Sequence, residues 1–210
     1  MKESIYYTYM YIYIVYIVYI CICRSIKLYV AFNNMIYIWK KIYLEYVYGF
    51  NMNKIEEIIA KELIKKEMTL AIAESCTGGN ISKKLTDISG SSKYLKGSIV
   101  AYSNSIKENF LDVKSDILLS KGAVSSEVAS MMAENIRKKF DVDIGLSTTG
   151  ISGPTGGSKL KPLGLIYIAI STKKEKIVKK FNFKVGRKEH RKVATYKALS
   201  MLYSLVKNKI

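Results

Sequence analysis

From residue 53 onward, apolar and polar positions alternate between helical and strand-like spacing. Apolar residues recur at helical spacing over residues 55–64, with Glu and Lys between them, which predicts an amphipathic helix. TLAIA, residues 69–73, is a short apolar run with the length of a buried strand. The start of this region therefore has the pattern of an α/β domain.

The alternation continues to the C-terminus. It predicts helices over residues 76–88, 126–140 and 187–206, and strands over 97–103, 143–150, 163–171 and 176–185. Ser125 or Ser126 has the side chain of a helix N-cap, and the last strand is charged enough for a sheet edge. We expect a three-layer α/β/α domain with a central mixed, largely parallel sheet.

Residues 1–51 differ sharply in composition from the rest. Twelve of the 17 tyrosines lie there, and residues 5–23 carry no charge over a length that could cross a bilayer. A membrane anchor is one interpretation; a signal peptide is disfavoured by tyrosines at mid-span and by the lack of a small-residue cleavage site. We favour a third, in which translation begins at Met52, because alternating Tyr and Ile is what a T-A nucleotide tract encodes. The expected division is a low-complexity segment, residues 1–51, and a folded domain, residues 52–210.

Net charge and cysteine content limit the expected partners. The chain carries 34 basic and 17 acidic residues, a net charge of +17, but the lysines are spread along it and are not interleaved with aromatic residues. We therefore expect an anionic small molecule as ligand and no nucleic acid. Three cysteines form no disulfide framework, so we expect a cytoplasmic protein, or a membrane-tethered one if residues 5–23 are an anchor.

AESCTGGN, residues 73–80, carries three neighbouring hydroxyl or thiol groups, on Ser75, Cys76 and Thr77. The expected strand-to-helix junction favours negative charge there, although the same residue types also form ordinary turns and caps, and Thr77 is the expected cap. The only histidine, His190, lies in what reads as an exposed helix start. A Cys-His pair or a Ser-His-Asp triad is therefore disfavoured, and so is a metal site.

A lysine can replace histidine as the base if burial or nearby positive charge keeps it neutral. VAYSNSIKENF, residues 100–110, supplies Tyr102 at a strand end and Lys107 shortly after it. The alternative for Lys107 is an ordinary solvated lysine.

A glycine-rich stretch, residues 148–164, holds five glycines and both prolines between two apolar strands. Such a connector lets backbone approach a ligand and offers N–H groups to an anion. It matches neither a P-loop nor GxGxxG. We expect a binding role, although a plain hairpin connector would look similar.

Five segments occur together in the order and spacing of one family: AESCTGG, GSIVAYSNSIK, GAVSSEVASMMA, TTGISGPTGGSKLKPLGLIYIAI and GRKEHRKVATYKAL. Over residues 53–207 the chain resembles the C-terminal domain of the competence/damage-inducible protein CinA, the stand-alone nicotinamide-nucleotide amidohydrolases. It departs from the family at Ser152, where alanine is common, and at Thr155.

The resemblance implies hydrolysis of the carboxamide of nicotinamide mononucleotide to nicotinate mononucleotide and ammonia, without metal or cofactor. It places the nucleophile on Ser75 and the groups that assist it on Tyr102 and Lys107. It also implies a homodimer. The alternative is a catalytically silent nucleotide-binding or regulatory module of the same fold.

The remaining site assignments rest on electrostatics. We expect Lys107 to take the proton of Ser75, directly or through Tyr102, and backbone N–H groups to stabilise the oxyanion. The expected oxyanion and turn residues are Thr77, Gly78 and Gly79. The expected substrate-binding residues are Gly150, Gly153, Gly156, Gly157, Arg187 and Arg191.

Overall fold

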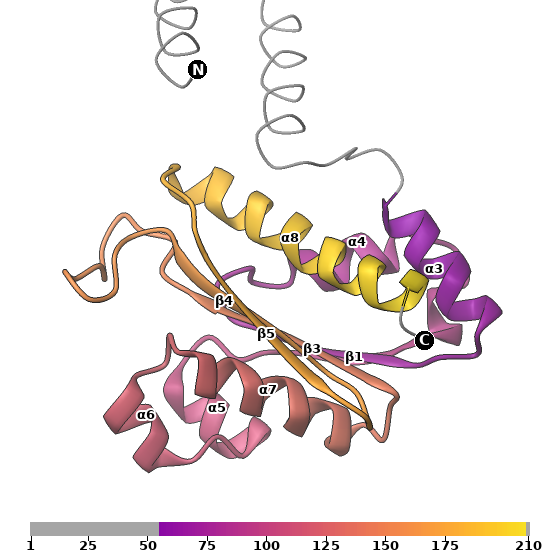
Figure 1. Cartoon of the computed structure of the whole chain (residues 1–210), viewed down its shortest axis with the longest axis horizontal. Coiled ribbons are helices and arrows are strands. Elements are labelled where there is room, and N and C mark those ends of the chain that lie inside the picture. Colours follow the sequence, from indigo (N-terminus) through magenta and orange to yellow (C-terminus); the bar gives the residue numbers. More distant parts are fainter. Residues whose placement is uncertain (1–54, 209–210) are drawn as a thin grey trace, which may run out of the picture. The chain divides into compact units, whose positions relative to one another are not determined.

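The computed structural model describes residues 55–208 (Figure 1). The predictions for residues 1–51, including an anchor over 5–23 and a start at Met52, lie outside the described residues. The helices are α3 (Ile55–Lys65), α4 (Asn80–Thr86), α5 (Asn104–Leu111), α6 (Ser115–Lys121), α7 (Ser126–Lys139) and α8 (Arg187–Asn208). The strands are β1 (Leu70–Glu74), β2 (Leu95–Val100), β3 (Ile144–Gly150), β4 (Leu165–Ser171) and β5 (Lys176–Asn182).

The five strands form one mixed sheet in the order β2-β1-β3-β4-β5. Strand β1 pairs in parallel with β2 on one side and with β3 on the other. Strand β4 is antiparallel to both β3 and β5, so it alone runs against the others. The predicted mixed sheet and the edge position of the last strand are confirmed, although parallel pairing is confined to β2, β1 and β3.

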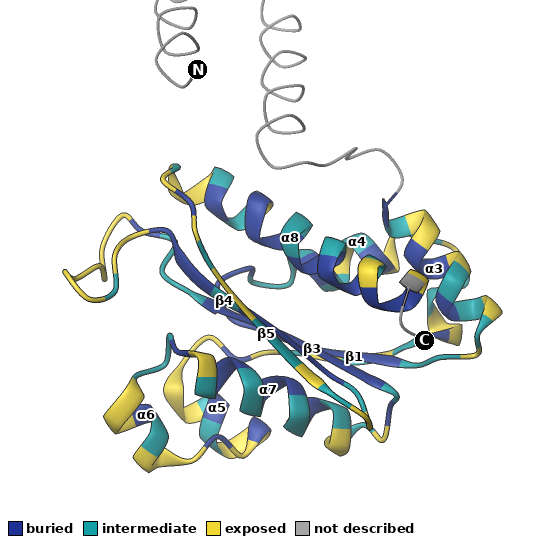
Figure 2. Cartoon of the chain, viewed as in Figure 1, coloured by how far each residue is buried: buried dark blue, intermediate teal, exposed yellow. Residues whose placement is uncertain are grey.

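Helices cover both faces of this sheet. Helices α3, α4 and α8 lie on one face, and α5, α6 and α7 lie on the other (Figure 1). Every residue of β1 is buried because the strand is central and covered on both sides (Figure 2). The predicted three-layer α/β architecture is confirmed. In the described part of the chain, no helix has the length and apolar character needed to cross a membrane.

The strand connections change direction at the carboxyl end of β1. Helix α4 joins β1 to β2 on one face, and α5, α6 and α7 carry the chain back across the other face to β3. Ligands of α/β sheets bind where neighbouring strands are connected in opposite directions, here between β1 and β3. AESCTGG begins at this point.

Local sequence explains most element boundaries. The Ser125 side chain caps α7 by accepting the Val128 N–H, as predicted. Helix α7 approaches β3 so closely at Gly145 that a Cβ there would lie 2.0 Å from the Ala133 carbonyl oxygen. The helix predicted from residue 76 begins only at Asn80, and α6 was not predicted.

Candidate active site

Ser75 lies directly after β1, beside the carboxyl ends of β2 and β3. Its N–H donates to the Thr148 carbonyl of β3 at 3.0 Å, and the Ala101 N–H beyond β2 donates to the Glu74 carbonyl at 2.7 Å. Ser75 is thus held between the carboxyl ends of three strands. Ser75 is only 8% exposed, so the part of a ligand that contacts its hydroxyl is shielded from bulk water.

A tight turn, residues 75–79, separates β1 from α4. The Gly78 N–H donates to the Ser75 carbonyl at 3.1 Å, and Gly78 and Gly79 have φ angles of 58° and 89°. Glycine adopts these positive φ angles without the steric cost that other residues incur. The prediction that Thr77 caps the helix was wrong: Gly79 is the N-cap, and the Thr77 hydroxyl is hydrogen-bonded to the Thr148 hydroxyl at 2.8 Å.

The Glu74 carboxylate fixes this turn through hydrogen bonds. It is fully buried and accepts the N–H groups of Gly79 at 2.9 Å, Ile81 at 3.2 Å and Ser82 at 2.9 Å, together with the Ser82 hydroxyl at 2.6 Å. One side chain thereby satisfies free amides of the first turn of α4. Glu74 was not among the predicted site residues, although a charged residue at the end of an otherwise apolar strand is a signal visible in the sequence.

Lys107 contacts Ser75 from helix α5, which lies on the face of the sheet opposite α4. Helix α5, capped by the Ser103 side chain, points the Lys107 side chain back to the carboxyl end of β2. Its Nζ lies 3.3 Å from Ser75 Oγ and 2.8 Å from the Ala101 carbonyl oxygen, with the Ser103 carbonyl oxygen at 3.5 Å. The solvated-lysine alternative is therefore wrong.

Burial lowers the pKa of Lys107 below that of a free lysine. The residue is 2% exposed, and no carboxylate within residues 55–208 forms an ion pair with it. Burial disfavours the ammonium form, and the neighbouring Cys76 opposes the shift only in part. A neutral amine beside a serine hydroxyl is the arrangement that general-base activation requires.

Cys76 is unsuited to act as the nucleophile. It is buried, and burial raises the pKa of its thiol to about 12, although the Thr148 side chain and Lys107 act in the opposite direction. The group therefore stays a protonated thiol at neutral pH, whereas the thiolate is the reactive form. Of the neighbouring candidates, Ser75 alone has the lysine amine as a hydrogen-bonding partner.

Tyr102 does not join the Ser75–Lys107 pair. Its side chain is 63% exposed, and its hydroxyl accepts a hydrogen bond from Arg187 Nη2 at 2.8 Å. Among the described residues it has no hydrogen bond to Ser75 or Lys107. The geometry favours direct proton transfer between Ser75 and Lys107, with Tyr102 at the rim.

The first turn of α8 presents three neighbouring side chains to the site, from Arg187, His190 and Arg191. Arg187 Nη1 donates to the Gly153 carbonyl at 2.6 Å, and Arg191 Nη2 donates to the Thr77 carbonyl at 3.0 Å. Positions three and four apart share one helix face, so this turn contacts both the glycine-rich loop and the Ser75 turn. The prediction that His190 is exposed was wrong, because its side chain is fully buried.

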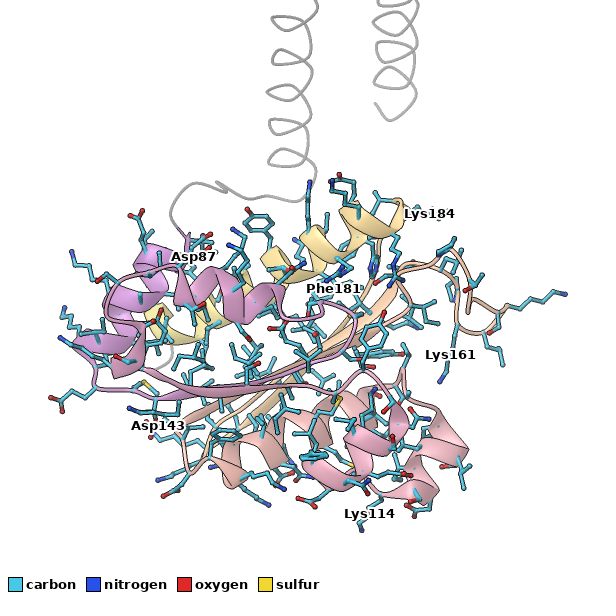
Figure 3. All side chains as sticks on the ribbon, turned by 180° about the vertical axis from the view of Figure 1, so that it is seen from behind. Asp87, Lys114, Asp143, Lys161, Phe181 and Lys184 are labelled. Atoms are coloured by element: carbon cyan, nitrogen blue, oxygen red, sulfur yellow. The ribbon has the colours of Figure 1, made fainter. Side chains whose placement is uncertain are left out.

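The glycine-rich loop, residues 151–164, joins β3 to β4 as a hairpin connection and begins beside Ser75. A Cβ on Gly150 would lie 3.1 Å from Cys76 Sγ and 2.8 Å from the Leu165 carbonyl oxygen, so only glycine fits. Gly153 has a φ of 75° and gives its carbonyl to Arg187. Gly156 and Gly157 lie farther along, in the exposed part of the loop that carries Lys161 (Figure 3).

The predicted oxyanion donors are not equally available. The N–H groups of Gly78 and Gly79 are taken by the Ser75 carbonyl and the Glu74 carboxylate. Within residues 55–208, the N–H groups of Cys76 and Thr77 form no hydrogen bond to another residue. Of the predicted oxyanion donors only the Thr77 N–H remains a candidate. The N–H of Cys76, the residue after the expected nucleophile, is a second candidate that was not predicted.

Within residues 55–208, no three side chains of His, Cys, Asp or Glu converge on a point that could hold a metal ion. Lys107 contacts Ser75, Arg191 and the Glu74 carboxylate contact its turn, and Arg187 contacts Tyr102 and the glycine-rich loop. Apart from Glu74 these groups are basic, which suits an anionic ligand.

Comparison with known proteins finds relatives of the region of the chain that contains this site. A family model described as the CinA C-terminal domain matches residues 52–206. A CinA-like protein of Desulfotalea psychrophila is 45% identical over 158 residues, which cover 75% of this chain and 38% of the relative. The chain thus spans about two fifths of the length of that relative.

Solved structures show the same fold. The competence/damage inducible protein CihA of Agrobacterium tumefaciens has a TM-score of 0.69 and 34% identity, covering 74% of this chain and 98% of that one. The competence damage-inducible protein A of Klebsiella pneumoniae has a TM-score of 0.73 and 26% identity, covering 77% and 100%.

Proposed function

Because the chain belongs to the CinA C-terminal domain family, we propose that it hydrolyses the carboxamide of nicotinamide mononucleotide to nicotinate mononucleotide and ammonia. The observation that carries the proposal is the buried amine of Lys107, 3.3 Å from the Ser75 hydroxyl. The identity of the substrate is inferred from the family that the AESCTGG and YSN-x-x-K segments resemble.

The first step is acylation of Ser75. Neutral Lys107 accepts the Ser75 hydroxyl proton as Oγ bonds to the amide carbon, whose π electrons move to its oxygen. The Ala101 carbonyl accepts one Nζ–H at 2.8 Å, which leaves the nitrogen lone pair free to face Ser75. Burial supports this step because it lowers the Lys107 pKa and so raises the fraction of neutral amine.

The oxyanion of the tetrahedral intermediate needs hydrogen-bond donors beside Ser75. The N–H groups of Cys76 and Thr77 supply them, since both lie in the turn that begins at Ser75. Donors fixed by folding need no reorganisation during the reaction. Glu74 and the two glycines of the turn contribute by fixing the backbone that carries these donors.

The intermediate collapses when the C–N bond breaks. The Lys107 ammonium returns its proton to the departing nitrogen, which leaves as ammonia, and the acyl group remains on Ser75. Lys107 then takes a proton from water, whose hydroxide attacks the ester carbon, and returns a proton to Oγ as Ser75 is released. Lys107 is neutral again at the end of the cycle.

The anionic end of the substrate requires cationic partners at the rim. Arg187 and Arg191 lie on the face of α8 that contacts the site, one against the glycine-rich loop and the other against the Ser75 turn. Each guanidinium has five N–H groups, so donors remain for a phosphate after these contacts. Tyr102, hydrogen-bonded to Arg187, belongs to the same rim.

The test is ammonia release from nicotinamide mononucleotide by the 210-residue chain. Wild type should release ammonia, Ser75→Ala should not, and Lys107→Met should release it far more slowly. The exposed lysine variant Lys114→Met should match wild type (Figure 3). Undiminished release by Ser75→Ala would refute the mechanism. Nucleotide binding without any release by wild type would favour the silent binding module.

A further inference from the structure

His190 is a buried titratable group that the proposed reaction does not use. Its Nδ1 lies 2.9 Å from the Ser152 hydroxyl, and its Nε2 lies 2.9 Å from the Gly164 carbonyl oxygen. Ser152 and Gly164 are close to the two ends of the glycine-rich loop. One imidazole therefore joins the outgoing and returning strands of the loop.

The hydrogen-bond directions follow from the chemistry of the partners. A carbonyl oxygen only accepts, so Nε2 carries the hydrogen and donates to Gly164. In neutral imidazole Nδ1 then has a lone pair and accepts the Ser152 O–H. Burial supports the neutral form, because it lowers the pKa of His190 despite the opposing bond to Gly164.

Backbone hydrogen bonds also hold this point: the Leu165 N–H donates to the Pro162 carbonyl at 3.2 Å, and the Phe183 N–H donates to the Gly164 carbonyl at 3.0 Å. The Ile151 N–H donates to the Leu165 carbonyl and the Gly164 N–H to the Ile151 carbonyl, both at 2.8 Å. Regular β3–β4 pairing ends at Gly150 and Ile166. The bridge through His190 adds a side-chain link between Ser152 and Gly164 to the backbone bonds at the neck of the loop, residues 151–152 and 164–165.

The bridge also connects the loop to the arginines of α8. His190 stands between Arg187, which holds the Gly153 carbonyl, and Arg191, which holds the Thr77 carbonyl. Gly153 immediately follows Ser152, so a shift of the neck would displace the carbonyl that orients the Arg187 guanidinium. The other side of the imidazole faces the Phe183 ring, with centroids 5.9 Å apart.

We infer that His190 is a positioning residue for substrate binding: by bridging Ser152 and Gly164 it fixes the neck of the glycine-rich loop and, through Gly153, the guanidinium of Arg187. The inference rests on the proposed function, since it assigns the loop and Arg187 to the nucleotide. His190 does not touch the reacting atoms, so its loss should weaken substrate binding more than turnover.

Three variants of the full chain test the bond between Ser152 and His190. Ser152→Ala removes only the bond to Nδ1, and alanine is common at this position in the family. His190→Gln retains an amide donor near the Nε2 position for Gly164 and loses the Nδ1 acceptor. The double variant loses the same single bond between Ser152 and His190 that each single variant loses. Ser204→Ala, an exposed position near the other end of α8, is the matched control.

The first measurement is steady-state ammonia release. The single variants should raise KM for nicotinamide mononucleotide about three- to tenfold, the range for one hydrogen bond, with kcat within about twofold of wild type. The double variant should be no worse than the poorer single variant, because both remove one interaction. Unchanged KM in both single variants, or equal losses of kcat, would overturn the inference.

The second measurement, amide hydrogen exchange, does not depend on catalysis. Peptides spanning residues 151–165 should exchange faster in Ser152→Ala and His190→Gln, while those of β1 and α7 exchange as in wild type. Unchanged exchange in the loop would overturn the inference. If wild type binds nucleotide without releasing ammonia, the proposed hydrolysis fails alone, and the dissociation constant replaces KM in the same comparison.

Discussion

The Nζ of Lys107 lies 3.3 Å from the Oγ of Ser75, although 32 positions separate the two residues along the chain. Parallel pairing of β1 with β2 brings the two segments together, because each residue follows a strand that ends at the same edge of the sheet. The pair is enclosed, and the lysine has a backbone carbonyl as its second close partner. In the proposed mechanism, the protonation state of Lys107 therefore controls the reaction.

Replacing Lys107 by methionine should lower kcat/KM by about 10²- to 10⁴-fold, the usual contribution of a general base. Methionine has similar length and fills the same buried space without an amine. The measurement is ammonia release at saturating and limiting nicotinamide mononucleotide. Lys114→Met controls for the loss of a lysine, and a Lys107→Met enzyme as active as that control would contradict the assignment.

The same substitution should change the pH dependence of stability. The folded-state pKa of Lys107 is lowered, so between it and the unfolded value of about 10.4 the unfolded chain binds more protons. Below the folded-state pKa, burial of the charged Lys107 therefore lowers the free energy of unfolding of the wild type by its full amount. This loss disappears as the pH rises to the unfolded-state pKa. The stability of Lys107→Met relative to wild type should fall over that window in denaturant titrations; a pH-independent difference would count against a perturbed lysine.

The pH profile of catalysis should carry the same signature. Since the neutral amine is the active form, kcat/KM should rise with pH and level off, with its midpoint below the ordinary lysine pKa of about 10.5. Initial rates in overlapping buffers measure this rise of kcat/KM with pH, which should be absent from Lys107→Met. A profile that is flat throughout the stable range would show that no such base operates.

Cys76 should be chemically silent in the folded protein. Burial raises the pKa of its thiol to about 12, so almost no thiolate exists at neutral pH. Iodoacetamide should leave the Cys76 peptide unmodified in native protein and alkylate it after denaturation, as read by mass spectrometry. Cys76→Ala should retain ammonia release within about tenfold of wild type. Fast native alkylation, or loss of activity as complete as in Ser75→Ala, would reopen the choice of nucleophile.

Glu74→Gln should disturb the Ser75 turn. The carboxylate accepts four hydrogen bonds, and a glutamine NH₂ group facing N–H donors cannot accept. Leaving buried donors unsatisfied costs about 1–3 kcal/mol, so unfolding in urea should shift accordingly and kcat should fall with it. Glu57→Gln, exposed on α3, is the matched control, and equal behaviour of the two variants would refute the role of Glu74.

The layers of the fold could be predicted because each strand and most helices carry a local signal. Apolar runs predicted β1 and β3, and the Ser125 cap predicted the start of α7. The start of α4 was mispredicted because the turn before it is held by the Glu74 side chain, a contact that helical spacing does not reveal.

The candidate site was predictable in its residue types and less so in its contacts. Ser75 and Lys107 follow neighbouring strands, so parallel pairing could bring them together once the sheet order was known. The burial of His190 and the hydrogen bond between Tyr102 and Arg187 depend on how α8 packs over the loop. Packing of this kind is set by tertiary structure and leaves no periodic signal in one sequence.

The most direct test of the central claim is to trap the acyl-enzyme. Protein mixed with nicotinamide mononucleotide and quenched in acid should carry, on the peptide that contains Ser75, the mass of the nucleotide less ammonia. The adduct should be absent from Ser75→Ala and strongly reduced in Lys107→Met. Ammonia release with Ser75 unmodified in every quenched sample and undiminished in Ser75→Ala, or an adduct on Cys76, would contradict the account.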